Sequence, residues 1–113
     1  MATDVQFVQF VADQINNSEF VEYKKMFGEY VLYYKKKVVA LICDNQLFIK
    51  PTEKGRAFIK NPVEKPPYPG AKQYFLIEGK IEDRDWLSEL IELTEPELKE
   101  PVKKKRKKRP PDS

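Results

Sequence analysis

The chain has 113 residues, of which 41% are apolar and 35% are charged, and its formal net charge is +3. A domain typically has about 100 to 150 residues, so this length predicts one packed domain. The sequence contains no histidine and a single cysteine, which excludes histidine-activated nucleophiles, histidine-ligated zinc and an internal disulfide. No apolar run approaches the ~18 residues of a membrane span and there is no signal-peptide pattern, so we expect a cytoplasmic protein.

An amphipathic helix is predicted over residues 3–16. Thr3 and Gln6 have the spacing of a capping box, in which each side chain satisfies a free backbone amide at the helix start. Apolar residues recur at helical intervals along this segment, namely Phe7, Val8, Val11 and Ile15. From Phe20 the composition changes to β-branched and aromatic residues, which predicts four strands near residues 22–27, 29–35, 38–43 and 46–50.

The turns between these strands differ in their chemistry. Asp44-Asn45 suits a two-residue hairpin turn, because both residues tolerate the left-handed backbone conformation. Lys35-Lys36 occupies the turn before the third strand. Lysine at positive φ costs roughly 1 kcal/mol, so the sequence predicts a wider turn there that also includes Lys37.

The second half of the chain alternates helix, extended connection, strand and helix. Thr52 is the expected N-cap of a helix over residues 53–60, and Asn61-Pro62 ends it. Prolines hold residues 61–72 in an extended connection. The remaining pattern predicts a strand over residues 73–78 and a helix over residues 83–94, with the acidic residues of its first turn acting as caps.

The order of these elements is α-β-β-β-β-α-β-α, and neighbouring strands are joined by short turns. This order predicts an α+β fold, a two-layer sandwich in which an antiparallel sheet of about five strands carries helices packed mainly on one face. The domain is predicted to cover residues 1–95. Residues 96–113 are predicted to be a disordered basic tail, because they contain prolines and no apolar periodicity.

Several motifs along this pattern resemble those of the N-terminal domain of the TfoX/Sxy competence regulators. They are Met26-Phe27-Gly28, Leu32-Tyr33, Ala40-Leu41-Ile42, Leu47-Phe48-Ile49-Lys50, and Tyr74-Phe75 before a helix with Trp86 and Leu87. The resemblance covers roughly residues 3–94 and implies a two-layer α+β layout similar to the secretion-chaperone-like folds. It also implies a link to transcription or DNA uptake, in a family for which no catalytic residue is known. Full-length competence regulators carry a second, helical domain where this chain has a basic tail.

The tail is the strongest candidate for a nucleic-acid contact. Residues 1–102 hold 14 basic and 17 acidic side chains, whereas residues 103–113 hold seven basic and one acidic. Closely spaced cations neutralise phosphates without reading sequence, so non-specific DNA or RNA binding is predicted. A solvated segment and an anionic membrane surface are the alternatives, although we expect no membrane partner. The basic residues are Lys103, Lys104, Lys105, Arg106, Lys107, Lys108 and Arg109.

A second candidate surface lies on the sheet, because residues 29–43 are apolar at successive positions. A sheet with helices on one side only would leave its other face exposed. Tyr30, Tyr33 and Tyr34 are the candidate partner residues, and because Tyr30 and Tyr34 alternate with Tyr33 the sequence predicts that both faces are apolar. The hypotheses are a homodimer through the sheet, or a protein partner such as a transcription regulator. Aromatic stacking of nucleic-acid bases is a further alternative, against the simpler interpretation that these rings form the core.

Two smaller sites complete the sequence predictions. Lys50, Lys54 and Arg56 gather near the start of the second helix, where backbone amides favour an anion. Cys43 is interpreted as a small strand residue rather than a reactive thiol. We therefore expect a non-enzymatic regulatory or interaction domain with no catalytic residue, no cofactor and no metal. A nucleic-acid-binding module that uses the basic tail is the alternative.

Overall fold

The computed structural model describes residues 3–16, 18–26 and 28–98. Within these ranges, six strands form one antiparallel sheet in the order β1-β2-β3-β4-β6-β5. The strands are β1 (Val21–Met26), β2 (Glu29–Tyr34), β3 (Lys37–Cys43), β4 (Gln46–Ile49), β5 (Val63–Lys65) and β6 (Tyr74–Ile77). The helices are α1 (Val5–Asp13), α2 (Glu53–Ile59) and α3 (Arg84–Thr94), with the short 3-10 helices η1 (Ser18–Phe20) and η2 (Glu95–Glu97). The predicted α+β fold is confirmed.

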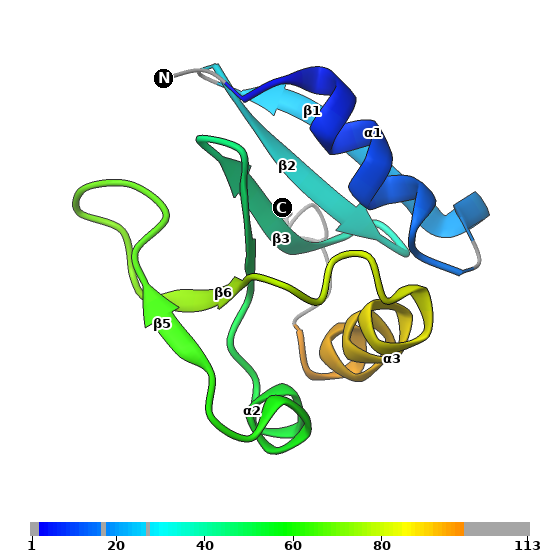
Figure 1. Cartoon of the computed structure of the whole chain (residues 1–113), viewed down its shortest axis with the longest axis vertical. Helices are drawn as coiled ribbons and strands as arrows, with labels where there is room; N and C mark the ends of the chain where they lie inside the picture. The colour runs from blue at the N-terminus through cyan, green and yellow to red at the C-terminus, as the bar shows by residue number, and fades with distance from the viewer. Residues whose placement is uncertain (1–2, 17, 27, 99–113) are drawn as a thin grey trace, which may run out of the picture.

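All three helices pack on one face of the sheet. Figure 1 shows α1 and α3 on the same side of the strands, with α2 beside α3. Alternate residues of each strand point into the core between the layers, as strand geometry requires. Strand and helix side chains meet in one buried apolar cluster, which includes Val8, Val11, Leu32, Tyr34, Ile42, Leu47, Ile49, Phe75, Leu87, Leu90 and Ile91.

The opposite face of the sheet, which we call the open face, carries a second and smaller apolar cluster. Its buried members are Cys43, Phe48 and Leu76, and Leu41 and Tyr74 pack against them. The loop between β5 and β6 stands on the side of the sheet away from α1 and α3 (Figure 1). The open face is therefore apolar, and no helix of the described residues covers it.

The N-cap of α1 corrects the predicted capping box. Asp4, not Thr3, caps this helix, because its side chain accepts a hydrogen bond from the backbone amide of Gln6. The Thr3 hydroxyl contacts the sheet instead, where it donates to the Glu29 carboxylate and accepts from the amide of Asn45. Local spacing suggested a cap, but these partners are 26 and 42 residues away in sequence.

The two hairpin turns were predicted with unequal success. Asp44 and Asn45 have φ angles of 53° and 57°, which confirms the tight turn between β3 and β4. The wider turn predicted before β3 is wrong. Lys35 and Lys36 adopt φ angles of 53° and 70°, and Tyr34 pairs directly with Lys37. The Lys35 ammonium lies 5.3 Å from the Phe20 ring centroid and 5.7 Å from that of Tyr34, contacts that offset part of the backbone strain.

Replacement of Lys36 by glycine is expected to stabilise the protein by about 0.5–1 kcal/mol. A non-glycine residue in the left-handed region costs about 1–2 kcal/mol, of which glycine's greater freedom in the unfolded chain offsets about 0.5–1 kcal/mol. Urea unfolding measures the change. Lys25→Gly is the matched control, because Lys25 is an exposed strand residue without positive φ, and it should destabilise. Equal destabilisation by both changes would show that the backbone of Lys36 is not strained.

The second half of the chain follows the predicted order with one addition. Thr52 and Asp83 cap α2 and α3 through their side chains, as predicted. The stretch predicted as a plain connection contains the short strand β5, which pairs with β6 at the sheet edge. Pro62 and Pro66 flank it, and an edge position tolerates proline because one side of the strand needs no hydrogen-bond partner. Across the described ranges, none of the helices has the length and apolarity to cross a bilayer.

Candidate functional site

The open face is hollowed between β1–β3 and the loop that follows β5. The cavity has a volume of about 490 Å³, within the roughly 300–1,000 Å³ range of typical binding pockets. Two exposed side chains stand in its lining, Met26 from β1 at 44% exposure and Tyr68 from the β5–β6 loop at 54%. The other lining residues are Glu29, Tyr30, Val31, Leu41 and Cys43. This arrangement suits an apolar group.

Two titratable groups of the open face, Cys43 and Tyr74, have raised pKa values. Burial, then the carboxylates of Glu29 and Asp44, raises the pKa of the Cys43 thiol to about 11. Burial, then nearby Tyr68 and Cys43, raises the pKa of Tyr74. A thiol that stays protonated is a poor nucleophile, so the placement of Cys43 agrees with its interpretation as a small strand residue.

Cys43 is expected to resist alkylation in the folded protein. Near pH 8 the native thiol should react with iodoacetamide at least ~10-fold more slowly than the same thiol in urea, because both burial and the raised pKa suppress the thiolate. The raised pKa also contributes stability that is fully present below pH 9 and is lost as the pH rises toward 11. Equal rates in native and unfolded chains would contradict the buried, protonated thiol.

The three tyrosines predicted as a partner surface do not share a face. Tyr30 and Tyr34 are buried at 9% and 2% exposure in the cluster beneath the helices, which corrects their assignment to an exposed surface. Tyr30 also borders the cavity of the open face. Tyr33 is half-buried and points to the opposite side, where the Lys24 ammonium lies 5.7 Å from its ring centroid. Tyr68 was missed, although an aromatic residue within a proline-rich segment was a usable signal.

The predicted anion site at the start of α2 is occupied by a carboxylate of the same chain. The amides of Glu53 and Lys54 donate to the two oxygens of Glu97 at 3.3 and 2.9 Å. Arg56 pairs with Glu64 and lies over the Phe75 ring, and burial lowers the pKa of Lys50. The amides that an external anion would need are therefore already bonded.

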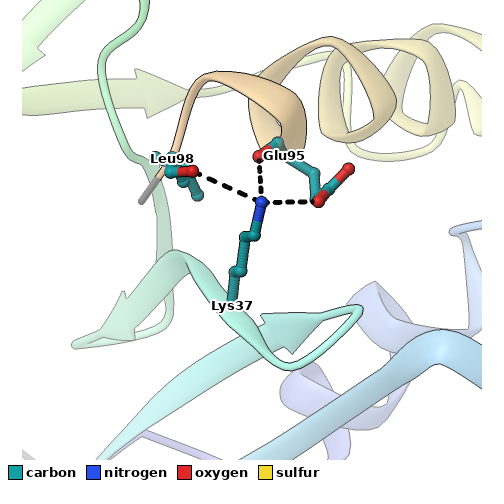
Figure 2. Close-up of polar contacts among 3 residues, drawn as sticks. All are labelled: Lys37, Glu95 and Leu98. Atoms are coloured by element: carbon teal, nitrogen blue, oxygen red, sulfur yellow. Dashed lines mark hydrogen bonds and ion pairs between the residues drawn. The ribbon is translucent and has the colours of Figure 1, made fainter. Parts of the chain in front are cut away.

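A lysine from the sheet holds the C-terminal end of the described chain. Figure 2 shows the Lys37 ammonium between Glu95 and Leu98. Its Nζ lies 2.9 Å from Glu95 Oε2, and it donates to the backbone carbonyls of Glu95 and Leu98 at 3.4 and 3.3 Å. The two side chains are only 10% and 15% exposed. The described fold thus continues to Leu98, beyond the predicted boundary at residue 95.

The predicted nucleic-acid contact residues, 103–109, lie outside the described residues. Their contribution therefore remains a prediction from charge alone.

Comparisons with known proteins place this fold in a family. The TfoX N-terminal domain model matches residues 13–97. This chain belongs to the TfoX N-terminal domain family. A relative from Spirochaeta aurantia, described as an uncharacterized 12.7 kDa protein in trpE 5'region, is 40% identical over 111 residues, which cover 98% of this chain and 96% of the relative.

The TfoX N-terminal motifs have structural roles in this chain. In the opening motif, Gly28 has a φ angle of +83°, and the Glu29 carboxylate accepts hydrogen bonds from the Thr3 hydroxyl and from the amide of Asp44. Glu29 thereby ties the N-terminal segment to the β3–β4 turn. The motifs thus build the scaffold, and the apolar cavity beside Glu29 is the candidate functional site.

Proposed function

We propose that the chain is a non-enzymatic regulatory domain of the competence-regulator type, which acts by receiving an apolar side chain of a partner protein on its open face. The single observation that carries the proposal is the cavity of about 490 Å³ lined by Met26, Val31, Leu41, Cys43 and Tyr68. Exposed apolar side chains around a concave surface are typical of protein-binding sites.

The electrostatics of the cavity support binding rather than catalysis. The Cys43 thiol is protonated at neutral pH, and Glu29 already accepts hydrogen bonds from Thr3 and Asp44. The sequence has no histidine to activate a nucleophile. Family membership supports a regulatory role of the competence-regulator kind.

Affinity capture from the native cell tests the proposal. The full chain and Tyr68→Lys would serve as baits, and retained proteins would be identified by mass spectrometry. Because Tyr68 is an exposed loop residue, the lysine variant should fold normally but bring a charge into the cavity, and capture of the partner should fall at least ~10-fold.

Two matched variants control this experiment. Tyr68→Phe keeps the ring and should capture the partner like the natural chain. Phe10→Lys changes an α1 side chain that is 41% exposed and does not line this cavity, and it should also leave capture unchanged. A partner retained equally by Tyr68→Lys would count against the open face.

A second candidate function is non-specific nucleic-acid binding by the tail, which the run of seven basic residues from 103 to 109 favours. Binding of DNA would be titrated with salt for the full chain and for a version that ends at Pro101. If the tail carries the affinity, the full chain should bind more tightly, with log K falling about 0.7–0.9 per log unit of salt for each neutralised phosphate. Equal, weak binding by both versions would remove this function.

A further inference from the structure

The strand β1 forms one edge of the sheet and has a free side. It pairs only with β2 in the described part of the chain, and Figure 1 shows it at the outer end of the sheet. Its exposure is high for a strand, since Glu22, Lys24, Lys25 and Met26 are all exposed. An edge strand of this length is a template for pairing with another strand.

The hydrogen-bonding pattern fixes which β1 residues face outward. The Phe20 carbonyl accepts from the amide of Lys35 at 2.9 Å, one position beyond the Val21–Tyr34 pair. Hydrogen-bonded pairs alternate along an antiparallel ladder, so the even-numbered residues of β1 point their backbone groups at β2. Val21, Tyr23 and Lys25 therefore point theirs outward.

We propose that β1 pairs antiparallel with β1 of a second copy of this chain, about a two-fold axis at Tyr23. In this register Val21 faces Lys25 of the second copy and Tyr23 faces its equivalent, so all the outward backbone groups are satisfied in hydrogen-bonded pairs. The pairing joins the two sheets into one. It uses the backbone edge of β1 rather than the cavity of the open face, although Met26 borders both, and it does not rest on the proposed function.

Charge selects this register over its neighbours. With the axis at Tyr23, Glu22 of each copy lies opposite Lys24 of the other, on the same face of the joined sheet. Two neighbouring registers, with the axis at Glu22 or at Lys24, would also pair the outward-pointing backbone groups of the two strands. They would set Glu22 opposite Glu22 or Lys24 opposite Lys24. Like charges directly opposite each other destabilise a sheet, whereas opposite charges stabilise it.

The same charges also bear on which strand can pair with β1. Edge lysines normally discourage pairing with a neutral strand. Here Lys24 would have a carboxylate opposite it, which favours a second copy over an unrelated strand.

A charge-swap series measured by analytical ultracentrifugation tests the proposal. The full chain should dimerise reversibly at micromolar to millimolar concentration. Glu22→Lys and Lys24→Glu each replace two opposite-charge pairs with two like-charge pairs, and each should raise the dimer dissociation constant by about 10- to 100-fold. The double variant Glu22→Lys/Lys24→Glu restores opposite charges and should dimerise like the natural chain.

Mixing the two single variants provides an independent outcome. The Glu22→Lys variant carries lysine at both positions and the Lys24→Glu variant carries glutamate at both. A heterodimer of the two should therefore form at concentrations where neither variant dimerises alone. Circular dichroism would confirm that the variants, which change only exposed side chains, remain folded. A natural chain that stays monomeric, a double variant that fails to recover, or dimers unaffected by any swap would overturn the proposal.

Discussion

Replacement of Gly55 by alanine is expected to lower the free energy of unfolding by about 2 kcal/mol, and replacement by leucine by more. Gly55 lies buried in α2. A Cβ atom there would come within 2.8 Å of Thr52 Oγ1, 3.4 Å of Leu90 Cδ1 and 3.5 Å of Phe75 Cε2. The first of these separations is too short for a real contact, so either the helix or the Thr52 side chain must move.

Movement of Thr52 is costly because its hydroxyl is the N-cap of α2 and accepts from the Gly55 amide at 2.9 Å. Loss of a cap costs about 0.5–2 kcal/mol, and separation of α2 from α3 and β6 adds a packing loss. Alanine also has a helix propensity about 1 kcal/mol better than that of glycine, which offsets part of the penalty. The close approach of Thr52 to the added Cβ atom therefore makes the net effect on stability unfavourable.

Urea unfolding of Gly55→Ala and Gly55→Leu measures these changes. Lys54→Ala is the matched control, because Lys54 is an exposed residue of the same helix, and it should change stability by no more than about 0.5 kcal/mol. A Gly55→Ala protein as stable as the natural chain, or more stable, would show that α2 is not held this closely.

The second large effect is expected at the ion pair of Lys37 and Glu95. Replacement of Lys37 by methionine should lower the free energy of unfolding by about 3 kcal/mol, because it leaves a mostly buried carboxylate without its ammonium partner. It also removes the donor to the carbonyls of Glu95 and Leu98. The end of the described chain would then lose its attachment to the β2–β3 hairpin.

The double variant Lys37→Met/Glu95→Met separates the pair from its surroundings. Removing both charges together leaves neither one buried alone, so the double variant should be more stable than Lys37→Met by at least about 1 kcal/mol. Thermal or urea unfolding gives the four free energies of the cycle. Strictly additive losses would indicate that the two side chains act independently.

The regular part of the fold was predictable because local pattern and tertiary structure agree there. Strand composition located each end of β1 to β4 to within one residue. Thr52 was found as a cap, and Asp83 was found among the acidic residues at the start of the last helix, because a cap needs only its own helix. The failures required distant partners. Thr3 looked like a cap but is bonded to Glu29 and Asn45, and the tight Lys35-Lys36 turn follows from strand pairing despite its backbone cost.

The candidate site was less predictable than the fold. The sequence showed that β2 is apolar at successive positions, which predicts an apolar open face but not which tyrosines lie on it. Tyr30 and Tyr34 face the helices, while Tyr33 faces away. The cavity also depends on Tyr68, which reaches it from a loop 37 positions after Val31. The hydrogen bond from the Lys54 amide at the start of α2 to the Glu97 carboxylate is a similar long-range contact.

Hydroxyl-radical footprinting of the chain with its captured partner tests the role of the open face most directly. Met26 and Tyr68 are reactive side chains, exposed in the free chain, and both line the cavity. The structure predicts that the partner protects Tyr68 and Met26 by several-fold, while exposed Phe10 on α1 reacts as before. Unchanged oxidation of Tyr68 and Met26 in the complex would contradict docking on the open face.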